Sequence, residues 1–281
     1  MNSITTISDL QKNISDFKQQ QKTIAFVPTM GKLHDGHLSL IKEAKKRADI
    51  IIVSIFVNPT QFGPNEDFDA YPRDLVTDLK LCTENAVDVV FLPTKEDLYG
   101  YSETPTEIYI PALSTLYCGK TRQNFFKGIC SVVLRLFILI QPDIAIFGEK
   151  DYQQFIILSQ MVRDLFLPIR MISVPIYREK NGLAMSSRNA YLNNIEQDEA
   201  ATIFKALMIA KDLFQNGESK TIKLTESVVH FIQKHTQIKI DYCVGVDYKS
   251  LREKEHLNKF DRLLFAGYLN STRLIDNIVL D

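Results

Sequence analysis

Short apolar runs rich in β-branched residues alternate with amphipathic stretches of helical period over roughly the first 175 residues. A run that is apolar at almost every position predicts a strand buried on both faces, and helices between such strands predict a parallel sheet covered on both sides. The predicted strands cover residues 23–28, 50–57, 87–92, 144–147 and 169–175, and the predicted helices cover 35–47, 74–85, 128–141 and 152–166. The sequence therefore predicts an α/β fold.

The pattern changes after residues 178–182. Two helical patterns, at 195–214 and 224–235, precede three strand-like runs. These runs cover residues 238–248, 263–269 and 274–280. Helices followed by consecutive strands are typical of a small α+β domain. We expect an α/β domain at residues 1–178 and a smaller C-terminal α+β domain at residues 179–281.

Composition limits the partners of the chain. Its 281 residues include 33 Lys and Arg against 34 Asp and Glu, so no long-range field favours nucleic acid or an anionic membrane. The longest apolar run, 132–140, contains Arg135 and is too short to span a bilayer. The four cysteines lack a metal-ligand spacing and are expected to be reduced. We predict a cytoplasmic protein that binds neither nucleic acid nor membrane.

The segment 28–37, PTMGKLHDGH, lies between the first predicted strand and the first predicted helix. Ligands of open α/β sheets bind at the carboxyl ends of strands, and a helix N-terminus favours phosphate. Gly31 and Gly36 allow a close approach of backbone to phosphate. His34 and His37, three residues apart, can share one helical face and donate hydrogen bonds to phosphoryl oxygens. Alternatively, the two histidines are metal ligands, although no Glu lies between them, or are purely structural.

Two further segments occupy similar positions after predicted strands. In FGEKD, residues 147–151, Lys150 supplies a flexible positive charge for a phosphate. Asp151 either caps the following helix or holds a nucleotide hydroxyl or metal. In NPTQF, residues 58–62, Asn58 and Gln61 either bind a small polar substrate through neutral amides or serve turn chemistry.

A fourth segment, MSSRN at residues 185–189, lies just past the expected domain boundary. Adjacent hydroxyls and a guanidinium can hold a polyphosphate leaving group. The alternative is an ordinary loop with a Ser N-cap. Asp78, in the helix at 74–85, is a further candidate contact for magnesium or triphosphate, and the metal ligands are otherwise left unassigned.

Together these segments resemble one enzyme family. The blocks that carry the resemblance are TMGKLHDGH, VSIFVNPTQF, AYPRDL, CGKTR followed by FKG, QPDIAIFGEKDYQQ and GLAMSSRNAYL. Their order and spacing are similar to those of the pantothenate synthetase (pantoate–β-alanine ligase) family, from about residue 24 to 192. The resemblance implies a Rossmann-like nucleotidyltransferase fold with an HxGH variant of the HIGH motif, and an MSSR segment similar in role to the KMSKS loop of class I aminoacyl-tRNA synthetases.

The resemblance also implies the reaction. (R)-Pantoate and ATP would form pantoyl adenylate and diphosphate, and β-alanine would then attack the acyl carbon to give pantothenate and AMP. The family uses magnesium and is typically homodimeric. The implied pathway is pantothenate and coenzyme A biosynthesis.

Site residues are carried over position by position from the resemblance. His37 would be the catalytic histidine, assisted by His34 and Lys150. Gln61 would contact both pantoate and β-alanine, and Gln154 would hold pantoate. The ATP site would comprise Met30, Gly31, Lys32, Leu33, His34, Asp35, Gly36, His37, Gly148, Glu149, Lys150, Asp151, Tyr177, Met185, Ser186, Ser187 and Arg188.

The chain departs from the family pattern at two places. Tyr177, expected to contact adenine through its backbone, stands where the family commonly has Val. After Arg122 the family usually reads RPGHF, whereas this chain has Gln123, Asn124, Phe125 and Phe126. A backbone contact can survive the change at Tyr177, although a larger ring can reshape the edge of the pocket. Because the blocks on both sides of the loop after Arg122 are intact, we interpret that departure as drift within an active enzyme.

Two other interpretations remain open. A related nucleotidyltransferase would move AMP or CMP to a phosphorylated acceptor and stop there, but it would need more basic residues for that acceptor than NPTQF provides. A catalytically silent nucleotide or RNA sensor would keep the fold, but the intact His34, His37, Lys150 and Arg188 argue against it.

Overall fold

A computed structural model describes residues 1–63, 66–101 and 106–281. Contacts within the chain divide it into two compact units. The N-terminal unit contains residues 1–149 and 157–175, and the C-terminal unit contains residues 150–156 and 176–281. The expected division at residue 178 thus differs from this grouping, because residues 150–156 belong with the C-terminal unit by their contacts.

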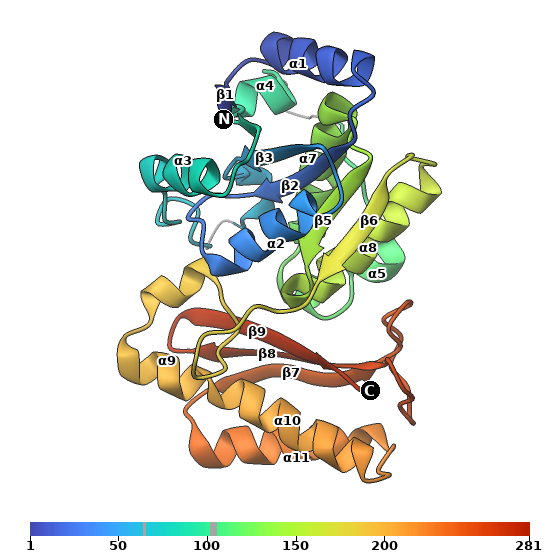
Figure 1. Cartoon of the computed structure of the whole chain (residues 1–281). Helices are drawn as coiled ribbons and strands as arrows, with labels where there is room; N and C mark the ends of the chain where they lie inside the picture. The colour runs from blue at the N-terminus through green and yellow to red at the C-terminus, as the bar shows by residue number, and fades with distance from the viewer. Residues whose placement is uncertain (64–65, 102–105) are drawn as a thin grey trace. The chain divides into compact units, whose positions relative to one another are not determined.

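Within the described residues, six parallel strands form the sheet of the N-terminal unit, in the order β1-β4-β3-β2-β5-β6 (Figure 1). They are β1 (Asn2–Ile4), β2 (Ile24–Thr29), β3 (Ile50–Ile55), β4 (Val89–Phe91), β5 (Ile144–Gly148) and β6 (Arg170–Val174). The α/β prediction is confirmed. The strand β1 was not predicted, because only Ile4 of its three residues is buried and the other two are polar.

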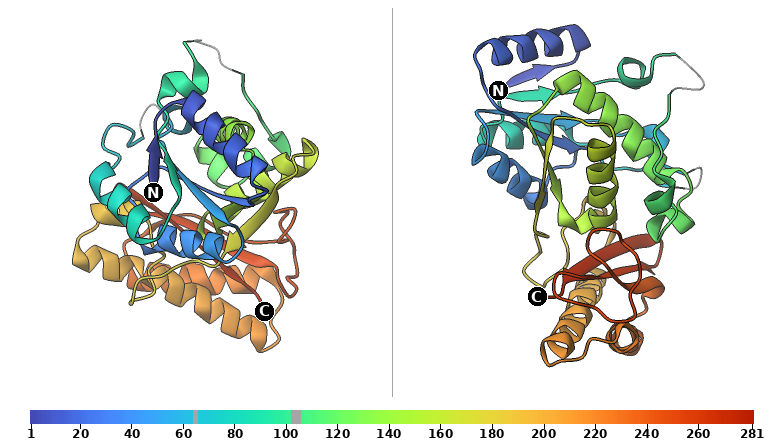
Figure 2. Two further views of the ribbon diagram at one scale, coloured as in Figure 1. Left: turned by 45° about the horizontal axis from the view of Figure 1, so that its top comes forward. Right: turned by 90° about the vertical axis from the view of Figure 1, so that its right-hand side faces the viewer.

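Helices cover both faces of this sheet (Figure 2). The helix α2 (Asp35–Lys45) packs on β2, β3 and β5, and α1 (Ile7–Gln19) packs on α7 (Phe125–Ile140). Among the described residues up to 164, the other α-helices are α3 (Leu75–Glu84), α4 (Lys95–Tyr99), α5 (Pro111–Ser114), α6 (Cys118–Thr121) and α8 (Tyr152–Asp164). Coverage on both faces explains why residues 24–27 and 90–91 are fully buried, as an uninterrupted apolar run predicts.

The strand order has a switch point between β2 and β5. From β2 the chain winds outward through β3 to β4, whereas β5 and β6 lie on the other side of β2. Loops that leave the carboxyl ends of two such strands diverge and leave a crevice where α/β proteins bind ligands. The loop after β2 carries the segment 30–37, and β5 ends at Gly148.

The C-terminal unit has a three-stranded antiparallel sheet among its described residues, in the order β7 (Lys239–Val246), β8 (Arg262–Leu269) and β9 (Thr272–Val279). The helices α10 (Thr202–Gln215) and α11 (Thr221–His235) pack on each other and on this sheet. The expected helix 195–214 is divided into α9 (Asn194–Ala200) and α10. The predicted smaller α+β unit is therefore present.

Residues 150–156 belong with the C-terminal unit for a physical reason. The Tyr152 hydroxyl donates to the Tyr248 carbonyl oxygen at 2.6 Å, and the Arg262 guanidinium lies 3.9 Å from the centre of the Tyr152 ring. The Asn277 side chain donates to the Lys150 carbonyl oxygen at 3.3 Å. These are contacts at long sequence separation, which strand and helix periodicity does not reveal.

Candidate active site

The loop from β2 to α2 has a conformation that depends on Gly31. This residue has a φ of +83°, and a Cβ there would lie 3.0 Å from Asp78 Oδ2 and 3.1 Å from Ile55 Cγ2. The following residue, Lys32, has a φ of +49°. The Gly31 N–H donates to Thr29 Oγ1 at 3.2 Å, and the Thr29 hydroxyl donates to the Ser54 carbonyl oxygen at 2.8 Å. The loop is therefore held tightly against neighbouring strands.

Asp78 on α3 holds the same loop. Its Oδ2 accepts from the Lys32 N–H at 2.9 Å and its Oδ1 from the Leu33 N–H at 2.7 Å. The residue is 1% exposed. Burial raises the pKa of Asp78 above its ordinary value, although the two N–H donors oppose that shift. Both oxygens therefore bind the loop backbone, and the expected contact of Asp78 with magnesium or triphosphate stays a prediction.

His34 and His37 meet at the N-terminus of α2. The His34 ring is the N-cap, with Nδ1 accepting from the Gly36 N–H at 3.1 Å. His37 Nδ1 accepts from the His34 N–H at 3.3 Å, and the ring centroids are 4.1 Å apart. An Nδ1 that accepts a hydrogen bond carries no proton, so each neutral ring has its proton on Nε2. The backbone thereby selects the tautomer in which both histidines are Nε2–H donors.

Asn58, after β3, has a structural role. Its Oδ1 accepts from the Thr60 N–H, the Thr60 hydroxyl and the Tyr99 hydroxyl at 3.3, 3.0 and 2.8 Å. Its Nδ2 donates to the Gly128 carbonyl oxygen at 3.2 Å, and the residue is 1% exposed. Asn58 and Gln61 were each predicted either to bind substrate or to stabilise the turn, and Asn58 stabilises the turn. The half-buried Gln61 ends the 3-10 turn Pro59–Gln61 that Asn58 stabilises.

Gly128 allows α7 to approach this turn closely. A Cβ at this position would lie 2.3 Å from the Thr60 carbonyl oxygen and 2.9 Å from the Gln61 nitrogen. Any side chain would displace the turn. Glycine is therefore needed in the FKG block because the backbone of the turn that carries Gln61 leaves no room for a side chain.

The departure after Arg122 also has a structural account. Asn124 has a φ of +66°, a conformation that Asn tolerates better than most residues and that suits the family's glycine. The Arg122 guanidinium lies 3.4 Å from the centre of the Phe125 ring. Arg122 also donates to Glu66 through two nitrogens, at 2.6 and 2.7 Å. Phe125, which replaces the family's histidine, thus stacks on an arginine that is already fixed by an ion pair.

Beyond β5 the chain makes the 3-10 turn Glu149–Asp151. Glu149 Oε1 accepts from the Ser173 hydroxyl at 2.8 Å, which directs this carboxylate toward β6. Lys150 Nζ lies 3.8 Å from Asp151 Oδ2, and its side chain is 20% exposed. Gln154 is half-buried in the first turn of α8.

The MSSR segment follows a narrow hairpin of the C-terminal unit. Residues Arg178 and Ala184 form an antiparallel bridge, and the Met185 N–H donates to the Tyr177 carbonyl oxygen at 3.0 Å. Ser186 then caps the 3-10 helix Ser187–Tyr191, its Oγ accepting from the Arg188 N–H at 3.3 Å. The hydroxyl and guanidinium of this segment are therefore carried by a short, capped helical turn.

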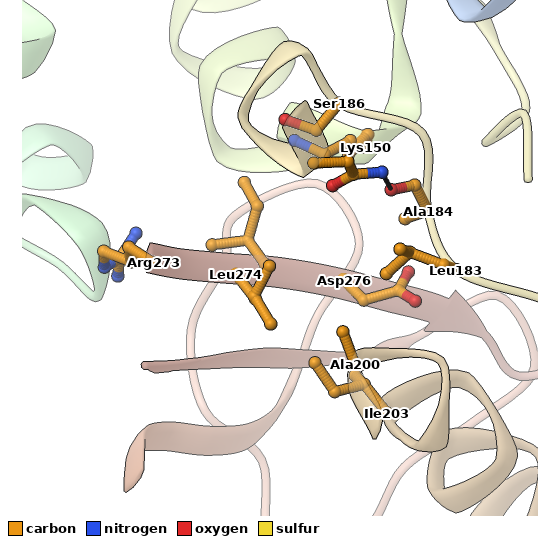
Figure 3. Close-up of a pocket in the computed structure, with 11 residues that line it drawn as sticks. Lys150, Leu183, Ala184, Ser186, Ala200, Ile203, Arg273, Leu274 and Asp276 are labelled. Carbon is orange, nitrogen blue, oxygen red and sulfur yellow. Dashed lines mark hydrogen bonds between the residues drawn. The ribbon is translucent and has the colours of Figure 1, made fainter. Parts of the chain in front are cut away.

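One pocket of the C-terminal unit brings Lys150 and Ser186 together (Figure 3). Asp276 of β9 lies on the same wall as Leu183 and Ala184. In the N-terminal unit, the parallel pairing of β2 with β3 and β5 brings the 30–37 loop, the Gln61 turn and Gly148 to one edge of the sheet. The predicted residues are thus gathered in two groups, one in each unit.

Two buried polar residues of the C-terminal unit were not predicted. Asp276 and Asn277 are 4% and 3% exposed. Burial raises the pKa of Asp276, and the guanidinium of Arg178 opposes that shift. The signal that would have found them is a charged residue inside an otherwise apolar strand, LIDNIV, since such a residue is rarely buried without a partner.

An open parallel sheet, with a glycine- and histidine-bearing loop at its switch point, defines an α/β enzyme that binds its ligand at strand ends. The model of the pantoate-β-alanine ligase family matches residues 2–279, and the chain belongs to that family. The pantothenate synthetase of Thermotoga neapolitana is 44% identical over 280 residues, with 100% of each chain covered. The predicted family is confirmed.

Solved structures agree with this assignment. The pantothenate synthetase of Thermus thermophilus superimposes with a TM-score of 0.94 at 36% identity, covering 100% of this chain and 99% of that one. The pantoate-β-alanine ligase of Francisella tularensis, solved with β-γ ATP and β-alanine, has a TM-score of 0.81 at 34% identity, covering 99% and 97%. The chain is an ATP-dependent ligase that condenses pantoate with β-alanine to give pantothenate, AMP and diphosphate.

Replacing Asp78 with Asn should destabilise the fold and weaken ATP use. An amide has one acceptor oxygen, so one of the two loop N–H groups loses its partner, which typically costs about 1–3 kcal/mol. Denaturant unfolding measures the change. Asp74→Asn on the same helix is the control, because Asp74 is a more exposed N-cap and Asn caps equally well. Equal stability of Asp78→Asn and wild type would contradict this role.

Proposed function

We propose that the family's two half-reactions are carried by the predicted residues in separate roles. In the first, a pantoate carboxylate oxygen bonds to the α-phosphorus of ATP, and the bond from that phosphorus to the diphosphate oxygen breaks. In the second, the β-alanine amine bonds to the acyl carbon, AMP leaves with the bonding electron pair, and the nitrogen loses a proton. Activation comes from ATP, so the protein needs to position the substrates and stabilise charge.

The observation that carries this proposal is the pair of hydrogen bonds in which Nδ1 of His34 and Nδ1 of His37 each accept a backbone N–H. Each Nδ1 accepts a backbone N–H, which leaves Nε2–H as the donor of the neutral ring. Two such donors at the N-terminus of α2 suit the negative charge that builds on the α-phosphate oxygens. We assign His37 as the catalytic histidine and His34 as its assistant.

The other residues proposed to contact ATP have different roles, which depend on the chemistry of each side chain. Lys150 would neutralise phosphate charge, and Ser186, Ser187 and Arg188 would hold the diphosphate as it leaves. A backbone group of Tyr177 would contact adenine. The backbone of the 30–37 loop and of residues 148–151 would line the rest of the nucleotide.

The acceptor site is proposed to rest on neutral amides. Gln61 would contact both pantoate and β-alanine, and Gln154 would hold pantoate. An amide can donate to a carboxylate and accept from a hydroxyl or ammonium group, which suits substrates of mixed charge. The fixed turn under Gln61 supports this role.

Magnesium is proposed to arrive with ATP. Among the described residues, no three His, Cys, Asp or Glu side chains are grouped as a metal site. Phosphate and water oxygens are the ligands that this ion prefers, and a few protein carboxylates at most are needed to complete them. When bound, it would neutralise the triphosphate charge. We assign no protein ligand to it.

Assembly and location complete the proposal. A homodimer in the cytoplasm is expected from the family resemblance, and light scattering on the purified chain tests the dimer. No helix in the described ranges is long and apolar enough to cross a membrane.

Diphosphate release that requires both ATP and pantoate is the direct test of this function. Nucleotidyl transfer to a phosphorylated acceptor, or nucleotide sensing, would not give this dependence. His37→Ala should lower the rate by ~10²–10³, the usual cost of removing one such donor. His230→Ala, on the exposed surface of α11, is the control and should retain wild-type turnover. Near-normal turnover of His37→Ala would remove His37 from the mechanism.

Lys150→Ala should slow adenylate formation by ~10²–10³ and leave the second half-reaction much less affected. Lys150 is assigned to phosphate charge, whereas the amine attacks the acyl carbon. Rapid-quench measurement with ATP and pantoate, and separately with preformed pantoyl adenylate and β-alanine, resolves the two steps. Lys205→Ala, exposed on α10, is the matched control. An equal loss in both steps would assign Lys150 another role.

Gln61→Ala should raise the KM for pantoate and for β-alanine by ~10-fold or more, since a hydrogen bond to a charged group is worth about 1.5–3 kcal/mol. Affinity for a non-hydrolysable ATP analogue should change little. Calorimetric titration and steady-state kinetics measure the two effects. A large loss of nucleotide affinity would mean that Gln61 belongs to the ATP subsite.

A further inference from the structure

The strand β9 carries two adjacent polar side chains inside the C-terminal unit. Asp276 and Asn277 are 4% and 3% exposed, between the apolar residues Ile275 and Ile278. Burial of a carboxylate is costly unless it is paired and hydrogen-bonded. The partners of these two residues therefore indicate why polar groups are kept there.

Asp276 binds the hairpin that precedes the MSSR segment. Its Oδ2 and Oδ1 accept from the two terminal nitrogens of Arg178 at 2.6 and 2.9 Å. One of those nitrogens also donates to the Gly182 carbonyl oxygen at 3.1 Å. The guanidinium lies 3.8 Å from the centre of the Phe204 ring. The guanidinium of Arg178 is thus fixed by a bidentate ion pair, and the backbone of Arg178 lies at the base of the hairpin.

The hairpin connects the fixed Arg178 to the MSSR segment, which carries the predicted phosphate contacts. Gly182, with a φ of +98°, lies at its tip, where a Cβ would be 2.8 Å from the Phe204 ring. Ala184 pairs with Arg178, and the Ala184 carbonyl oxygen accepts from the Asn189 side chain at 3.2 Å. Ser186 lies between those two fixed points. Its position therefore depends on the ion pair at the base of the hairpin.

Asn277 binds the Lys150 turn from the same strand. Its Nδ2 donates to the Lys150 carbonyl oxygen at 3.3 Å, and its Oδ1 accepts from Arg262 at 2.7 Å. The Asn277 N–H donates to Asp276 Oδ1 at 2.7 Å, so the two side chains share one network. Asp276, Lys150 and Ser186 line a single pocket (Figure 3).

We propose that Asp276 and Asn277 are positioning residues, which hold the Lys150 turn and the hairpin of the MSSR segment at the spacing that ATP requires. Neither residue is assigned a contact with substrate. Directional hydrogen bonds to both segments set this spacing, and an apolar strand would provide no such directionality. The inference rests on the proposed phosphate roles of Lys150, Ser186 and Arg188.

Asp276→Asn keeps the size of the side chain and removes the charge-assisted fork to Arg178. We expect pantoate-dependent diphosphate release to fall ~10–100-fold and the KM for ATP to rise, because misplacement of about 1 Å at a distance from the chemistry can cost ~10² in rate. Reaction of preformed pantoyl adenylate with β-alanine should change by less than about threefold, and so should the KM for pantoate.

A purely structural role predicts a different result. Asp261, likewise buried (1% exposed) and paired with Lys254 in the same unit, provides the matched control. Asp261→Asn should lower the melting temperature and leave the ATP kinetics of the folded enzyme unchanged. If Asp276→Asn behaves in the same way, with wild-type KM for ATP and wild-type diphosphate release per folded molecule, the positioning role is overturned.

Arg178→Lys covers the case in which Asp276→Asn does not fold. Lysine keeps the charge and loses the planar fork, so the same selective loss is expected, at about 10-fold. An unchanged KM for ATP and unchanged diphosphate release in this variant would also overturn the proposal.

Affinity for a non-hydrolysable ATP analogue separates this inference from the proposed function. A wild type that releases no diphosphate would refute the function. The positioning role would still be supported if Asp276→Asn binds the analogue ~10-fold more weakly than wild type does. It would be refuted if the two proteins bind the analogue with equal affinity.

Discussion

The parallel pairing of β2 with β3 on one side and β5 on the other is the constraint on which the N-terminal unit depends. Hydrogen bonding between parallel strands brings their carboxyl ends to one edge, so the 30–37 loop, the Gln61 turn and Gly148 emerge together. Because the strand order reverses at β2, the loop after this strand diverges from the one after β5. The pairing thus creates the place for a ligand before any catalytic side chain is considered.

Buried polar side chains then fix the conformations of the loops. Asp78 binds two N–H groups of the 30–37 loop, and Asn58 binds the turn that carries Gln61. In the C-terminal unit Asp276 and Asn277 bind the segments of Arg178 and Lys150. In each case the polar group compensates its own burial by satisfying backbone or guanidinium donors and acceptors, and the loop gains a fixed conformation. The polar side chains that are costly to bury are therefore the ones that fix the loops of the site.

After Arg122 the chain departs from the family pattern, and its own residues account for the conformation of this loop. Asn124, where the family has glycine, has a left-handed backbone conformation, and Phe125 provides a flat face for the Arg122 guanidinium. The ion pair of Arg122 with Glu66 holds the guanidinium in place. Loss of the family's Pro, Gly and His is therefore compensated by stacking and by the tolerance of Asn for positive φ.

Local sequence predicted five of the six parallel strands, the helices α2, α3, α7 and α8, the glycine-rich loop and the family, because periodicity and motif spacing are properties of neighbouring residues; the helix α1 was not predicted. Tertiary structure decided what sequence could not. It added the strand β1, gave Asp78 and Asn58 to the backbone, and grouped residues 150–156 with the C-terminal unit. The partners involved are 45 residues apart for Asp78, 70 for Asn58, 98 for Asp276 and 127 for Asn277. A polar side chain in a strand or helix has the same local appearance whether it faces solvent, a ligand or a distant backbone group, and only the folded chain brings that partner within hydrogen-bond distance.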